Sequence, residues 1–182
     1  MIKSLVVMAS LLMPLFIQAQ SPLDKIATKY SGTKGFNVVV ISKDMLQLFV
    51  TMADEKDTAT QAFKRSIALM NGMKVINCDL DLVKPAPGLV FYNEATAAFD
   101  PAIYSELIKG NDGFEDIRFL TKKNPKGQIT ELVMLEKGSR EIVAFSITGI
   151  IDLATVTKIS KSMGINGVDE LKKYKDNRKS KK

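Results

Sequence analysis

Apolar positions at the start of the sequence first follow a helical period and then become continuous. Ser21 and Pro22 are typical of an N-cap and a first helical residue, and they predict a helix over residues 22–31. Its apolar face consists of Leu23, Ile26, Ala27 and Tyr30. The β-branched run over residues 36–41 is nearly continuous in apolarity, which predicts an interior strand covered on both faces of a sheet.

Helical spacing returns after this strand. Ser42 predicts the N-cap of a helix that runs from residue 43 to about residue 54. The apolar stripe of this helix, which we expect to pack in the core, consists of Met45, Leu48, Phe49 and Met52. The helical period repeats over residues 57–71, and a strand is expected over residues 74–78.

The middle of the sequence has a weaker pattern. Residues 79–93 contain Pro85 and Pro87 and no clear period, and we interpret them as a loop or a short edge strand. Residues 94–109 are interpreted as helical, with a break or restart at Pro101 because proline disrupts a helix interior.

From residue 113 onward the pattern alternates with a period of two. It predicts three strands, over residues 117–121, 129–135 and 142–147. The connections are short enough to require an antiparallel meander, and a last helix is expected from Asp152 to about Gly164. The sequence therefore predicts a single α+β domain with a mainly antiparallel sheet of about five strands and helices packed on one face.

Four stretches of this pattern carry a family resemblance. They are VVVISKDML, YSELIKGNDGFEDIRFLTKK, ITELVMLE and EIVAFSITGIIDLATVTKISK. Together they resemble the domain-of-unknown-function 4252 family of small exported bacterial proteins, over roughly residues 24–163. The family has no established activity, so the resemblance implies no catalytic residue. A proline-rich insertion around residues 84–93 and a long basic tail depart from many relatives, as does the lack of a lipoprotein cysteine.

The first residues indicate export. Lys3 precedes an apolar run over residues 5–17, and Ala19 is a small residue at a suitable cleavage point, which is the pattern of a secretory signal peptide. We expect residues 1–19 to be removed. The run is interrupted by Pro14 and is too short to span a bilayer, so no transmembrane segment is expected in the mature protein.

The remaining chain is predicted to have two parts. Residues 20–171 form the single α+β domain, and residues 172–182 form a basic disordered tail. The lone cysteine, Cys78, lies far from the leader, so the protein is not expected to be a lipoprotein. The expected location is the periplasm of a Gram-negative bacterium.

Charge is concentrated in the tail. The sequence has a net charge of +6, and its last eleven residues hold seven basic residues and one acidic residue, which equals this whole excess. The domain is therefore close to neutral, and nucleic acid is not an expected partner. Weak contact with an anionic membrane surface would use Lys172, Lys173, Lys175, Arg178, Lys179, Lys181 and Lys182.

The residue types exclude several chemistries. The sequence contains no histidine, which excludes Ser-His-Asp triads, Cys-His pairs and histidine zinc sites. The single Cys78 excludes an intrachain disulfide and is expected to be buried. Asp79 and Asp81 follow a predicted strand and are the weak candidates for acid–base chemistry. No catalytic residue, cofactor or metal site is predicted.

One apolar and aromatic segment is a candidate docking patch. It consists of Leu89, Val90, Phe91 and Tyr92, and its alternative is packing over the sheet. The leading prediction is a non-catalytic exported protein that acts through contacts with an unknown envelope protein. Two alternatives stay open: a carboxylate-based hydrolase or small-ligand-binding protein, and an envelope-associated module held by the basic tail.

Overall fold

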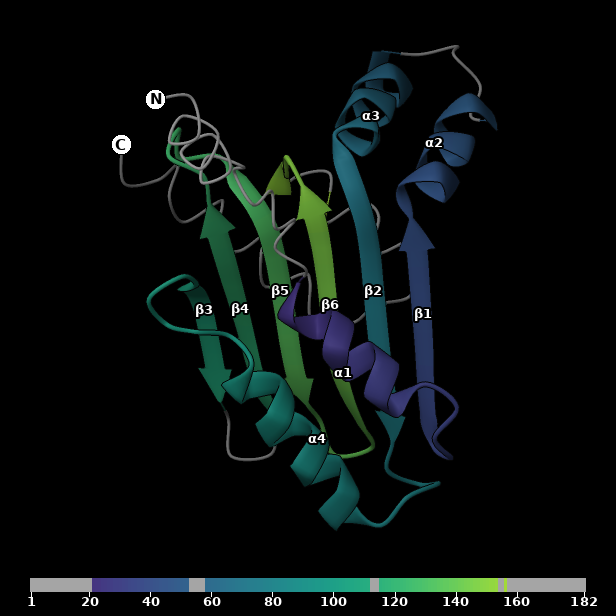
Figure 1. The fold of residues 1–182 in the computed structure, drawn as a ribbon, viewed down its shortest axis with the longest axis vertical. Helices are drawn as coiled ribbons and strands as arrows, with labels where there is room; N and C mark the ends of the chain where they lie inside the picture. Colours follow the sequence, from purple (N-terminus) through teal and green to yellow (C-terminus); the bar gives the residue numbers. More distant parts are fainter. Residues whose placement is uncertain (1–20, 53–57, 112–114, 154–155, 157–182) are drawn as a thin grey trace, which may run out of the picture.

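The computed structural model describes residues 21–52, 58–111, 115–153 and 156. Its strands are β1 (Phe36–Ser42), β2 (Met70–Asp79), β3 (Ser105–Asn111), β4 (Asp116–Lys123), β5 (Ile129–Lys137) and β6 (Glu141–Gly149). They form one six-stranded sheet in the order β1-β2-β6-β5-β4-β3, and every neighbouring pair is antiparallel (Figure 1). The α+β class and the C-terminal meander of β4, β5 and β6 are confirmed.

The helices are α1 (Pro22–Tyr30), α2 (Lys43–Met52), α3 (Thr58–Ala68) and α4 (Pro85–Ala97). Helices α1 and α4 lie across one face of the sheet, whereas α2 and α3 stand at the end where β1 finishes (Figure 1). The buried apolar side chains of α1 and α4 belong to one core cluster, and Leu46 of α2 and Ile67 of α3 belong to a second. The expectation of helices on one face is therefore not confirmed.

Helix α1 forms as its sequence predicts. The Ser21 hydroxyl accepts a hydrogen bond from the amide of Leu23 at 3.3 Å, and Pro22 occupies the first turn. At the other end, the Tyr30 hydroxyl donates to Glu94 Oε2 of α4 at 3.0 Å. Burial first, and then this bond to Glu94, raise the pKa of Tyr30 to about 12.

Helix α4 corrects the interpretation of residues 79–93 as a loop or edge strand. Pro85 lies in its first turn, where a backbone N–H has no partner within a helix, so proline begins this helix instead of preventing it. The interpretation of residues 94–109 as helical is also wrong beyond Ala97. Asp100 caps a single turn by accepting the amide of Ala102 at 2.8 Å, and β3 then adds a sixth strand.

Helix α4 approaches the sheet closely at Gly88. A Cβ atom at this position would lie 2.5 Å from Leu80 Cδ2 and 3.2 Å from Ile142 Cδ1. The same built atom would lie 3.6 Å from the sulfur of Cys78, whose side chain is fully buried, as predicted. The absence of a side chain at Gly88 therefore lets α4 lie close against this part of β2, without displacement of the side-chain ends of Leu80 and Ile142.

Strand β1 lies at one edge of the sheet, so the prediction of an interior strand is wrong. The predicted leader of residues 1–19, most of the last predicted helix and the basic tail of residues 172–182 lie outside the described residues. Within the described ranges, no helix combines the length and the apolarity needed to cross a membrane.

Candidate functional site

The apolar stripe of α2 faces solvent. Met45, Leu48, Phe49 and Met52 are 45%, 50%, 52% and 75% exposed. The prediction that this stripe packs in the core is therefore wrong. The packing is done instead by Leu46, which is 3% exposed, and by Val50, which packs partly buried against the second cluster. Because α2 has two apolar faces, the helical spacing identifies the stripe but not the face that turns inward.

The start of α2 is fixed by the strand before it. Ser42 ends β1, and its hydroxyl accepts a hydrogen bond from the amide of Met45 at 3.2 Å, as expected of an N-cap. The charged residues of α2, Lys43 and Asp44, are both in its first turn. The exposed stripe that follows carries no charge, and a patch of this kind is a common mark of a contact surface.

The predicted docking patch is divided by helix α4. Phe91 is fully buried and Tyr92 is 8% exposed, whereas Leu89 and Val90 are 47% and 53% exposed. The two aromatic residues pack over the sheet, so their prediction as docking residues is wrong. Burial, followed by the charge of Asp116, raises the pKa of Tyr92 to about 12. The exposed remainder, Leu89 and Val90, is small compared with the α2 stripe.

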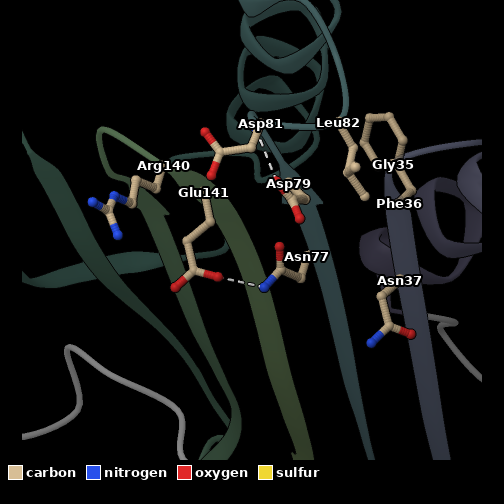
Figure 2. Close-up of a pocket in the computed structure, with 9 residues that line it drawn as sticks. All are labelled: Gly35, Phe36, Asn37, Asn77, Asp79, Asp81, Leu82, Arg140 and Glu141. Atoms are coloured by element: carbon tan, nitrogen blue, oxygen red, sulfur yellow. Dashed lines mark hydrogen bonds between the residues drawn. The ribbon is translucent and has the colours of Figure 1, made fainter.

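The carboxylate pair noted in the sequence lines a cavity of about 510 Å³. The cavity lies where β1 begins, β2 ends and β6 begins (Figure 2). Its lining residues are Gly35, Phe36, Asn37, Asn77, Asp79, Asp81, Leu82, Arg140 and Glu141. Strand register brings these residues together, because Asn37 pairs with Asn77 and Asp79 pairs with Glu141. Residues so distant in sequence give no local signal, and sequence reasoning missed all but the two aspartates.

Hydrogen bonds engage much of this cavity wall. The side-chain amide of Asn77 donates to Glu141 Oε2 at 2.5 Å, and Asp79 Oδ1 accepts the backbone amide of Asp81 at 2.9 Å. Figure 2 shows the Asp81 carboxylate on the side of Arg140 and the Asp79 carboxylate turned away from it. Asp79 therefore shapes the turn after β2, and the two aspartates do not form a converging acid–base pair.

Acidic character extends from this cavity to β5. Burial first, and then the carboxylates of Glu141 and Glu115, raise the pKa of Glu136 above its usual range. The carboxylates of Glu115, Glu136 and Glu141 thus lie near one another at an end of the sheet that also carries Lys137 and Arg140. Among the described residues, no group of three or more Asp, Glu, Cys or His side chains is arranged to hold a metal ion.

These features define a small α+β protein with a single antiparallel sheet, an uncharged apolar helix face and a modest polar cavity. The family model described as "Domain of unknown function (DUF4252)" matches residues 30–159, so the chain belongs to this family. The resemblance found in the sequence is confirmed. A comparison with curated proteins and another with solved structures each gave no match.

Proposed function

We propose that this protein is a non-catalytic exported protein that binds another protein through the α2 stripe. The observation that carries the proposal is the exposure of Met45, Leu48, Phe49 and Met52, which is 45% or more for each. Their spacing of i, i+3, i+4 and i+7 is the pattern that a helix presents when it lies in the apolar groove of a partner.

The size of the stripe limits the affinity that it can give. Full burial of one large apolar side chain contributes about 1.5–3 kcal/mol, so four that are about half exposed contribute about 3–6 kcal/mol together. Association costs about 4–15 kcal/mol in lost freedom of motion. The stripe alone therefore gives a weak complex, and a stable one needs further contact surface.

Site-specific cross-linking in the exporting cell tests this proposal. A photo-reactive amino acid at Met52 should give a discrete cross-linked product, whereas one at Ile103, which is exposed on the turn before β3, should not. The double variant Leu48→Asp and Phe49→Asp should abolish that product without lowering the thermal midpoint. Identical products from Met52 and Ile103, or a product that survives the double variant, would show that α2 is not the binding surface.

Export to the periplasm is part of this proposal. It is supported by the pattern of Lys3, the apolar run over residues 5–17 and the small residue Ala19. Mass spectrometry of the protein recovered from its own cells should find a chain that begins at Gln20. A chain that retains residues 1–19 would contradict the proposed cleavage.

A second candidate function is the binding of a small cationic ligand. It is favoured by the cavity, whose volume of about 510 Å³ lies in the usual range for small-molecule sites, and by its acidic lining residues Asp79, Asp81 and Glu141. A calorimetric screen of small amines should then detect a binder whose affinity falls in the variant Asp81→Asn. Arg140→Ala should raise that affinity, since it removes a like charge; an unchanged affinity in both variants would exclude this cavity.

A further inference from the structure

A buried carboxylate lies beside the first described residue of the chain. Glu131 of β5 is 5% exposed, and Ser21, which is equally buried, is the N-cap of helix α1. The hydroxyl of Ser21 donates to Glu131 Oε1 at 2.5 Å, and the hydroxyl of Tyr104 donates to Glu131 Oε2 at 2.8 Å. Both oxygens of Glu131 are thus placed as acceptors, which is the role of a carboxylate.

The charge of Glu131 has no cationic partner within the described part of the chain. The ion pairs found there use the carboxylates of Asp24, Glu94 and Glu106 instead. Lys122 stands opposite Glu131 in the register of β4 and β5, but no ion pair joins these two side chains. A buried charge with only neutral hydrogen-bond donors is strongly unfavourable, so this site is missing a cation.

The start of α1 supplies only part of the missing positive charge. The Ser21 hydroxyl accepts the amide of Leu23 and donates to Glu131, so it joins the carboxylate to the first turn of the helix. A helix N-terminus favours an anion, but its effect equals only roughly half of an elementary charge. A full positive charge next to Ser21 would therefore stabilise the carboxylate further.

We propose that the α-ammonium of Gln20, which is created when the leader is removed, pairs with Glu131. The inference rests on the proposed export, because cleavage after Ala19 makes Gln20 the first residue of the mature chain. One residue spans at most about 3.3–3.6 Å, so the ammonium lies within one residue length of Ser21. A carboxylate offers about four acceptor positions, and the hydroxyls of Ser21 and Tyr104 take two of them.

This pairing makes leader removal a step in folding. In the precursor, the nitrogen of Gln20 belongs to a peptide bond and has no charge, so Glu131 lacks a full counter-charge. Cleavage supplies that charge at the residue next to the N-cap of α1. Proteolysis therefore stabilises the start of α1 in its position against β5.

Chains made with defined first residues test the pairing, and the cleavage site in the cell is measured separately. We compare a full chain that begins at Gln20 with one that begins at Ile17, whose ammonium is three residues further away. A third chain begins with Gln20 cyclised to pyroglutamate; the α-amine bonds to the side-chain amide carbon and ammonia leaves, so the charge is lost at constant length. The urea midpoint at pH 7 should be highest for the free Gln20 amine. Equal midpoints for the three chains would overturn the proposal.

Two variants separate the charge of Glu131 from general stability. In Glu131→Gln, which keeps an acceptor oxygen, the midpoint difference between the free and the cyclised Gln20 end should disappear. In Tyr104→Phe, which keeps the carboxylate and loses one hydrogen bond, the difference should persist. A difference that survives Glu131→Gln, or that is lost in Tyr104→Phe as well, would contradict pairing with Glu131.

Acylation of the α-amine decides the question even if Glu131→Gln does not fold. Pairing raises the pKa of the Gln20 amine above its usual value of about 7.7–8.0, and each unit of increase lowers the neutral, reactive fraction about tenfold at pH 7. An amine-reactive ester should therefore label the chain that begins at Gln20 at least about tenfold more slowly than the chain that begins at Ile17. Mass spectrometry of the N-terminal peptides measures both rates, and equal rates would overturn the proposal.

Discussion

Replacing Glu131 by alanine should destabilise the fold by about 2–6 kcal/mol, since two buried hydroxyls would lose their partner. Glu131 lies on β5 and is 5% exposed. Its carboxylate accepts hydrogen bonds from the hydroxyl of Ser21 at 2.5 Å and from the hydroxyl of Tyr104 at 2.8 Å. Each hydroxyl left buried without a partner costs about 1–3 kcal/mol, and the two contributions together give this range.

Urea denaturation at pH 7 is the suitable assay, because the shift of its midpoint reports the change in the free energy of unfolding. The matched control is Glu106→Ala, which removes a carboxylate from the ion pair with Arg118 at the surface and should cost at most about 1 kcal/mol. Tyr104→Phe removes one of the two bonds and should fall between these values. If Glu131→Ala costs no more than Glu106→Ala, the buried carboxylate does not hold the start of α1 against the sheet.

The other predictions concern backbone strain, charge and the tail. Gly149 has φ +120°, and a Cβ there would collide with backbone atoms where β2 begins. Gly149→Ala should therefore lower the free energy of unfolding by at least about 1–3 kcal/mol in the same denaturation assay. A urea midpoint equal to that of the native protein would contradict this. Glu136→Gln should raise the unfolding free energy at pH 7, because the raised carboxyl pKa of Glu136 means that the fold favours the neutral form. This gain should shrink once the pH falls below the native pKa and should disappear below the ordinary value of 4.5. Tyr30 and Tyr92 have a pKa raised from 10.0 to about 12, so the stability that they contribute is complete below pH 10.0 and is lost as the pH rises toward 12. An absorbance titration that shows every phenol ionising near 10.0 would contradict this. Truncation before Lys172 should abolish co-sedimentation with anionic vesicles at low salt; equal sedimentation of both chains would exclude a tail contact.

Local rules were sufficient where one short signal decides the structure. Ser21 and Pro22 predicted the start of α1 because capping depends on neighbouring residues only. The meander followed from strand alternation and short connections, which leave an antiparallel arrangement as the simple solution. Helix α4 was missed because Pro85 acts as a breaker in a helix interior but as an initiator in a first turn, and the local sequence does not distinguish these positions.

The candidate binding surface shows a different limit. Apolar patterning identified the α2 stripe and the apolar run of β1, yet both were assigned to the interior of the domain. Apolarity shows that a surface is unfavourable in water, but not whether the same chain or another one covers it. The cavity was beyond prediction for another reason: Asn37, Asn77 and Glu141 meet through strand register, which depends on the whole sheet.

Because Gly88 lies close to the buried sulfur of Cys78, the reactivity of this thiol reports whether the helices over β2 move away from the sheet. The sequence contains one cysteine, so every thiol-labelling event on the chain occurs at this single sulfur. Cys78 is fully buried in the cluster that α1 and α4 cover, so reagent reaches it when these helices separate from β2 or when the whole domain unfolds. The labelling rate under native conditions therefore measures how often this helix layer opens. Comparing that rate with the rate of global unfolding would show whether the helices detach while the sheet stays paired.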